Sequence, residues 1–143
     1  MKSILVFIDG TICDDRHRLN LLGKQEFNSY DNIMKDIPVI GSVEFLKQIS
    51  LEYNIIYISA RLPELYDVTS KWLETQGYPK GKLYLASTQY ERLRIIEHEL
   101  LNQNIEVGIG DRWDDNQLHL MLGCKSIIVQ EYNADWDFVK KYI

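Results

Sequence analysis

Cysteine, positive charge and long hydrophobic runs are all scarce in this sequence. Its two cysteines, Cys13 and Cys124, lie far apart and in no metal-ligand spacing, so we expect reduced thiols and no disulfide framework. The 16 basic residues against 21 acidic ones give a formal net charge of −5, which argues against extended binding to duplex nucleic acid but allows a local basic cluster. No apolar run approaches the length of a membrane span, and the first residues reach a charge too soon for a secretory signal. We therefore expect a cytoplasmic protein that does not contact a membrane.

What is present is the composition of a globular protein, 45% hydrophobic and 26% charged, with a length that fits a single domain over residues 1–143. Apolar runs of strand length alternate with segments of helical periodicity, which predicts an α/β fold with a mainly parallel sheet and helices on both faces. A polar stretch over about residues 13–40 predicts two short helices and a small insertion or lid. The strands are expected near residues 4–8, 54–59, 83–85, 105–109 and 126–129.

The first of these strands runs directly into the turn Asp9-Gly10-Thr11. In open α/β sheets ligands bind beyond the carboxyl ends of the strands, where backbone N–H groups can face an anion. Asp9, Gly10 and Thr11 are therefore candidates for an anion-binding site. Phe7, two residues before Asp9, can neither attack phosphorus nor coordinate Mg²⁺.

The strand over residues 54–59 ends in Ser59-Ala60-Arg61. A serine hydroxyl at a strand end can donate a hydrogen bond to phosphate, and a guanidinium can bind phosphate through two parallel hydrogen bonds. The alternative is that Ser59 caps the following helix and Arg61 is a solvated surface charge. The sequence is compatible with both roles.

Three carboxylates, Asp111, Asp114 and Asp115, follow the strand over residues 105–109. Closely packed acids repel one another unless a cation or hydrogen bonds compensate, which makes this cluster a candidate Mg²⁺ site. Alternatively, one or two of these acids cap the next helix and complement its dipole. Between them lie Arg112 and Trp113, and Trp113 can either stack on a ligand or pack against the lid.

The three strand-end motifs, in this order, resemble the signatures of the haloacid dehalogenase superfamily. The resemblance implies a three-layer, Rossmann-like fold with a minimal cap or none, and hence an open site. In that family the first signature is Asp-x-Asp-Gly-Thr, in which the first Asp forms an aspartyl-phosphate and the second is the general acid and base. Aligned to this sequence, Asp9 takes the acid/base role and Phe7 occupies the position of the missing nucleophile. The Ser-Ala-Arg and Asp-Arg pairs favour the branch that contains polynucleotide kinase 3′-phosphatase domains and small acid phosphatases.

The same resemblance assigns further roles. A lysine that neutralises the phosphate in the family has no counterpart near residue 90, where Arg92 and Arg94 stand instead. The implied phosphate-binding residues are Gly10, Thr11, Ser59, Ala60, Arg61 and Arg94. The implied metal ligands are Asp9 and Asp111, supported by Asp115 or Asp114. Members of this branch often carry His-Arg shortly after the first motif, which makes Arg16 and His17 possible substrate contacts together with Arg112 and Trp113; a solvated turn with Asp-Arg pairs is the alternative.

These observations lead to three functional hypotheses. The first is a protein with a phosphatase fold that binds a phosphate ester with Mg²⁺ but is catalytically impaired because the nucleophile is absent. Its ligand would be a phosphorylated small molecule, a nucleotide or a nucleic-acid end. The second is an active Mg²⁺-dependent phosphomonoesterase that uses direct water attack or another acid. The third is a non-catalytic protein-interaction module.

Overall fold

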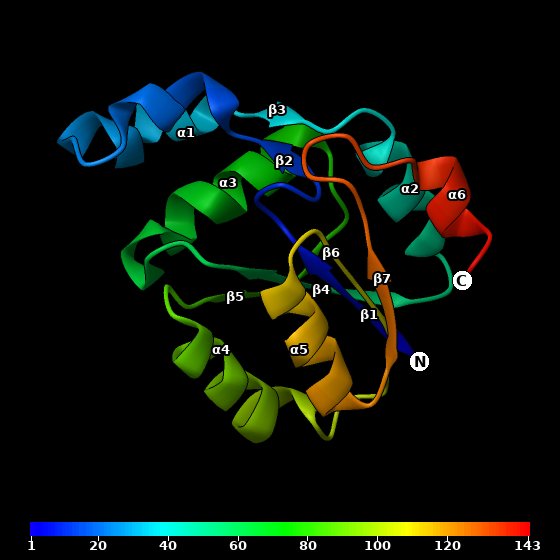
Figure 1. The fold of residues 1–143 in the computed structure, drawn as a ribbon. Helices are drawn as coiled ribbons and strands as arrows, with labels where there is room; N and C mark the ends of the chain where they lie inside the picture. The colour runs from blue at the N-terminus through cyan, green and yellow to red at the C-terminus, as the bar shows by residue number, and fades with distance from the viewer.

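The computed structural model describes residues 1–143, and its centre is a five-stranded sheet in the order β5-β4-β1-β6-β7 (Figure 1). Every neighbouring pair of strands is parallel, which confirms the predicted α/β architecture. The strands are β1 (Ser3–Phe7), β4 (Asn54–Ser59), β5 (Gly81–Leu85), β6 (Ile105–Gly110) and β7 (Lys125–Ile128). Phe7 is therefore the last residue of β1, and Asp9 lies in the turn that follows it.

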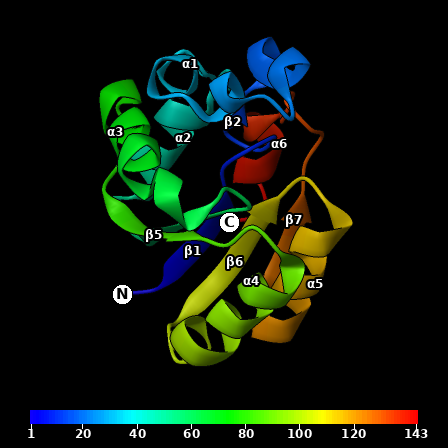
Figure 2. The ribbon, with the colours of Figure 1, turned by 90° about the vertical axis from the view of Figure 1, so that its left-hand side faces the viewer.

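Helices cover both faces of the sheet (Figures 1 and 2). One face carries α2 (Ser42–Ile49), α3 (Tyr66–Gln76, preceded by the turn η3, Pro63–Leu65) and α6 (Trp136–Lys140). The other carries α4 (Gln89–Ile95), its π-helical continuation η4 (Ile96–Leu100) and α5 (Trp113–Leu122). None of the helices has the length and apolar character needed to cross a bilayer.

The central strand β1 is buried on both faces, because its alternate side chains enter two different hydrophobic clusters. Ile4, Val6 and Ile8 pack into the cluster that includes Trp72 of α3. Leu5 and Phe7 pack into the smaller cluster under α4, η4 and α5. This explains the uninterrupted apolar run of the first strand and gives Phe7 a packing role in the second cluster.

The insertion after β1 contains three short helices where the sequence predicted two. Its ends, β2 (Cys13–Asp14) and β3 (Ile37–Pro38), form a two-stranded antiparallel sheet. Between these strands lie η1 (Arg16–Leu21), η2 (Gln25–Asn28) and α1 (Tyr30–Met34), and α1 packs against α3 (Figure 1). The extra helix arises because Ser29 caps α1 by accepting a hydrogen bond from the N–H of Asn32, which separates α1 from η2.

Candidate functional site

A small cavity of about 50 Å³ lies where β1, β4 and β6 end. By this measure one water needs about 10–15 Å³, so the space holds about three or four water molecules or groups of similar size. Its walls come from the three strand-end motifs and from α4. They are formed by Phe7, Ile8, Asp9, Ser59, Ala60, Arg92, Asp111, Arg112, Asp114 and Asp115.

Asp9 is held in place by hydrogen bonds from Ser59 and Arg61. Ser59 Oγ donates to Asp9 Oδ2 at 3.0 Å, and Arg61 Nη2 donates to Oδ1 at 2.8 Å. Arg61 Nε contacts both oxygens, at 3.0 and 3.3 Å. Burial acts to raise the pKa of Asp9, but the Arg61 guanidinium and the Ser59 hydroxyl outweigh it and hold the pKa below its usual value. Asp9 is thus an anchored anion and a weak base.

Arg61 lies behind Asp9 and its donors are directed to protein groups. Besides Asp9, its guanidinium donates to Thr69 Oγ1 and Asp36 Oδ2, each at 3.0 Å, and to Cys13 Sγ at 3.4 Å. Its side chain is 6% exposed. In the structure Arg61 is an internal counter-ion, and Ser59, which also lines the cavity, is a partner of Asp9. The phosphate-binding roles that the family resemblance implies for both residues stay predictions.

Asp36, which sequence reasoning missed, is the centre of this network. Its fully buried carboxylate accepts two hydrogen bonds from Arg18, at 2.8 and 2.9 Å, and one from His17 Nε2 at 2.7 Å. His17 therefore faces the lid interior. Arg16 pairs with Asp14 at 2.6 Å and lies over the ring of Tyr132. A lone acid in a polar stretch has no periodic signal, and for this reason Asp36 was not apparent in the sequence.

Asp111 has the opposite environment. Thr11 Oγ1 donates to its Oδ1 at 2.9 Å, but Oδ2 is buried with no hydrogen-bond partner. The side chain is 1% exposed. Burial, together with the nearby Asp115 and Glu131 carboxylates, raises the pKa of Asp111 to about 7. A buried carboxylate oxygen without a partner is costly, so a proton or a cation bound at that oxygen would be stabilising.

Gly10 makes room for Asp111. A Cβ at Gly10 would collide with the Asp111 carboxylate, and the residue has a φ of +86°, a conformation that favours glycine. The N–H groups of Gly10 and Thr11 donate to the carbonyls of Cys13 and Ile8 within the turn. These two residues therefore shape the turn and lie outside the cavity lining. The phosphate-binding role that the family resemblance implies for them stays a prediction.

The remaining acids of this motif divide between a structural and an exposed position. Asp115 Oδ2 accepts hydrogen bonds from the backbone N–H groups of Asp111 and Arg112, at 3.0 and 3.1 Å, and so caps α5. Asp114 lines the cavity and is exposed. Trp113 is 81% exposed beside the cavity, so of its two suggested roles it does not pack against the lid.

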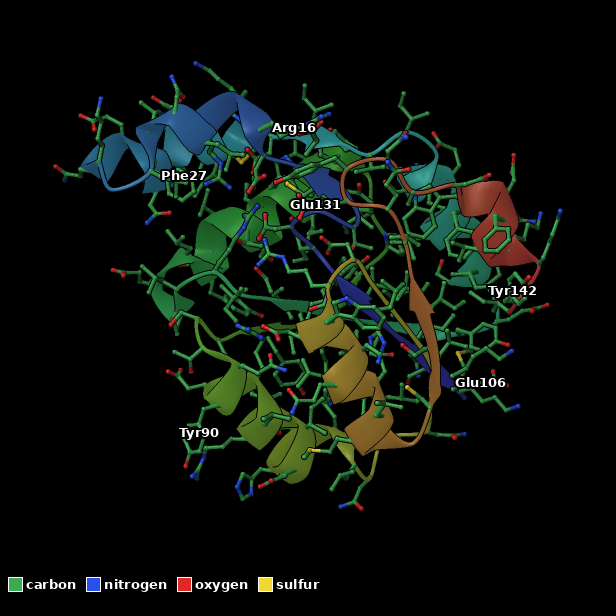
Figure 3. All side chains as sticks on the ribbon, in the orientation of Figure 1. Arg16, Phe27, Tyr90, Glu106, Glu131 and Tyr142 are labelled. Carbon is green, nitrogen blue, oxygen red and sulfur yellow. The ribbon has the colours of Figure 1, made fainter.

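Arg92 is the residue of α4 that brings a positive charge to the cavity. Its side chain lines the cavity and donates to the Ala86 carbonyl at 2.7 Å and to Gln89 Oε1 at 3.2 Å. Arg94 is exposed, and its guanidinium lies over the ring of Tyr90. Figure 3 shows Tyr90 on the outer side of α4. The helical phase could have identified Arg92, because it lies one turn before the buried Ile96.

Two clusters of side chains are candidates for holding a divalent cation. Asp9, Cys13 and Asp36 have ligand atoms within 4.8 Å of one another, but Arg61 Nη2 donates to all three and supplies the positive charge there. In the cavity, the unpartnered oxygen of Asp111 fits a hard cation such as Mg²⁺. Any metal would therefore be held on the Asp111 side of the cavity.

Several solved structures resemble this one. A chain of the Pnkp1/Rnl/Hen1 complex has a TM-score of 0.70 at 18% identity, covering 94% of this chain and 47% of that chain, so this chain spans about half its length. The class C acid phosphatase from Bacillus anthracis has a TM-score of 0.67 at 23% identity, covering 99% of this chain and 72% of that one, and was also solved with tungstate bound.

A haloacid dehalogenase-like hydrolase from Streptococcus pneumoniae gives a TM-score of 0.64 at 12% identity, covering 96% of this chain and 90% of that one. No protein-family model and no curated protein matches the sequence. The chain therefore has the fold of haloacid dehalogenase-like hydrolases and phosphatases, as the three motifs predicted.

Proposed function

We propose that this protein binds a phosphate ester at the cavity together with a divalent cation, with Mg²⁺ the expected ion, and that it does not catalyse efficient turnover through an aspartyl-phosphate. The observation that carries the proposal is the unpartnered, buried Oδ2 of Asp111, in a residue that lines the same cavity as Arg92. A cation bound to Asp111 would satisfy that oxygen. Mg²⁺ in proteins commonly completes its coordination with substrate phosphate oxygens.

The charges around the cavity explain why anion and cation would bind together. Arg92 and Arg112 face three carboxylates, Asp111, Asp114 and Asp115, while Asp9 is already neutralised by Arg61. A phosphate dianion alone would meet an excess of negative charge. A divalent cation removes that excess and leaves the two arginines free to contact phosphate oxygens.

Two residues argue for impaired catalysis. Phe7 is 5% exposed, and its ring packs edge-on against His119 with the centroids 5.8 Å apart, so β1 offers no nucleophile. Asp9 is occupied by Arg61 and Ser59, which lowers its pKa and its strength as a base. Loss of a covalent nucleophile removes several orders of magnitude from the rate.

The rim of the cavity favours a nucleotide or a nucleic-acid end among phosphate esters. Trp113 offers an exposed indole for base stacking, and the neighbouring Arg112, with a side chain 61% exposed, offers a charge for phosphate. The fold neighbours are consistent with a phosphoryl ligand, since they include acid phosphatase structures, one of them with the oxyanion tungstate bound.

Binding is tested by calorimetric titration with inorganic phosphate and with a 3′-phosphorylated oligonucleotide, each with and without Mg²⁺. We expect binding only when Mg²⁺ is present, loss of binding in Asp111→Asn and weakened binding in Arg92→Gln. Arg94→Gln is the matched control, because Arg94 lies outside the cavity. Equal affinity without Mg²⁺ would contradict the proposal.

Catalysis is tested by phosphate release from an aryl phosphate and from the same oligonucleotide. We expect the unaltered protein to stay near the background rate and Phe7→Asp to exceed it, because only the variant carries a carboxylate at the end of β1. Turnover by the unaltered protein that Asp9→Asn or Asp111→Asn abolishes would instead establish an enzyme that uses water or another acid.

A further inference from the structure

Glu131, which follows β7, brings an additional carboxylate to Asp111. Arg112 Nε lies 4.0 Å from Asp111 Oδ2 and 3.9 Å from Glu131 Oε2. Charge-assisted hydrogen bonds between guanidinium and carboxylate are about 2.7–2.9 Å long. Arg112 thus lies near both carboxylates and forms a hydrogen bond with neither.

The segment that carries Glu131 is fastened to the turn after β1. Tyr132 has a φ of 60°, in the left-handed region that non-glycine residues rarely adopt. Its N–H donates to the Gly10 carbonyl at 2.7 Å, and its hydroxyl donates to Asp15 Oδ1 at 2.9 Å. The guanidinium of Arg16 lies over the Tyr132 ring, 4.8 Å from its centroid. These contacts hold Glu131 close to the site.

We propose that Glu131 supplies the second carboxylate of the divalent-cation site, in place of the one that Phe7 cannot provide, with Asp111 as the first. This inference rests on the proposed function. The independent sign of a ligand is the Asp111 side chain itself, which is 1% exposed and has an unpartnered oxygen. The cation site is then built from β6 and the segment after β7, where the family signature would build it from β1 and β6.

The chemistry of the ligands selects the cation. Two carboxylates provide only oxygen ligands, which suit Mg²⁺, Mn²⁺ or Ca²⁺ better than softer metals. Arg112 would have to yield its position between the carboxylates, and its exposed side chain is free to do so. Arg112 is therefore a competitor of the cation.

The test is calorimetric titration of the full chain with MgCl₂ and with MnCl₂, without phosphate. We expect Glu131→Gln to weaken binding by at least about tenfold, as loss of a partner in a metal site does. We expect Arg112→Gln to strengthen binding, because it removes the competing charge. Asp137→Asn is the matched control, since it removes an exposed acid on α6 that lies outside the cavity, and it should leave the affinity nearly unchanged.

The possible outcomes separate this inference from the proposed function. No binding by the unaltered protein at millimolar Mg²⁺ overturns both. Binding that Asp111→Asn abolishes but Glu131→Gln leaves unchanged supports the proposed function and overturns the role of Glu131. An equal loss of affinity in Asp137→Asn and Glu131→Gln would show that only the net charge of the protein matters, and it would also overturn the role of Glu131. A cooperative melting transition, measured without metal on every variant, verifies that each one is folded.

Discussion

Asp9 and Asp111 follow adjacent strands of the same sheet edge, yet one is saturated with partners and the other is not. Asp9 accepts four hydrogen bonds from Arg61 and Ser59, and its pKa is lowered. Asp111 accepts one side-chain hydrogen bond, from Thr11, and its pKa is raised to about 7. Two carboxylates in similar motifs thus have pKa values shifted in opposite directions. The difference lies in the hydrogen-bond partners that surround each carboxylate.

The difference extends to the two halves of the molecule. In the half formed by β1, β4 and the insertion, Asp36 and Asp9 are matched by the guanidinium groups of Arg18 and Arg61. In the half formed by β6, α5 and β7, both Asp111 Oδ2 and His119 Nε2 are buried without partners. The buried charges of the first half are therefore paired, whereas the second half contains buried polar atoms that have no partner.

The largest expected effect on stability comes from disrupting the network of Asp36, Arg18 and Arg61. Asp36→Ala should lower the free energy of unfolding by about 3–5 kcal/mol, because it leaves the buried charges of Arg18 and Arg61 short of a counter-ion. Urea denaturation measures the change. Asp31→Ala, an exposed acid on α1, is the control and should stay within about 0.5 kcal/mol. Equal losses in the two variants would mean that the network adds no stability.

Low pH should lower the free energy of unfolding through His119, which lies in the half formed by β6, α5 and β7. Burial lowers the pKa of His119 from 6.5 to about 4. Below about pH 6.5 the unfolded chain binds a proton that the folded chain does not, so stability is complete above that pH and falls as pH drops toward 4, by up to about 3 kcal/mol. His119→Gln should remove this part of the pH dependence, as unfolding measured between about pH 7.5 and 4.5 would show. Parallel curves for variant and unaltered protein would exclude His119 as the cause.

Asp9→Asn should cost about 2–3 kcal/mol, because the hydrogen bonds from buried Arg61 lose their charged acceptor. The folded pKa of Asp9 is lowered, so its contribution is present at neutral pH and is lost as pH falls through that folded pKa. Thermal and urea unfolding at neutral pH measure the change. A variant as stable as the unaltered protein would show that Ser59 and Arg61 find other partners.

The substitution Asp111→Asn should have the smallest effect on the free energy of unfolding, and it should raise that free energy at high pH where the other substitutions lower it. The folded carboxyl has its pKa raised to about 7, so its contribution to stability is lost as pH rises from about 4 through 7. With a chelator at about pH 8 the variant should therefore match or exceed the unaltered protein, by about 1 kcal/mol. Asp114→Asn is the exposed control. If Asp111→Asn lowers the free energy of unfolding as much as Asp9→Asn does, the two carboxylates do not differ in their contribution to stability.

The sheet and its polar edge could be predicted from the sequence because buried parallel strands are continuous apolar runs followed at once by polar turns. This placed Asp9 and Asp111 at one edge. The pairing of Arg61 with Asp9 and Asp36 could not be predicted, because it joins residues 52 and 25 positions apart through side-chain geometry alone. Glu131 is equally inaccessible, since its position depends on a backbone conformation at Tyr132 with no sequence signature.

The contacts of Tyr132 connect the insertion to the segment that carries Glu131, the proposed cation ligand. The residue touches the turn after β1 through Gly10 and the insertion through Asp15 and Arg16, and it directly follows Glu131. If a substrate shifts the insertion, the position of Glu131 must respond. Thermodynamic reciprocity then requires that the cation change the affinity for that substrate by the same factor as the substrate changes the affinity for the cation.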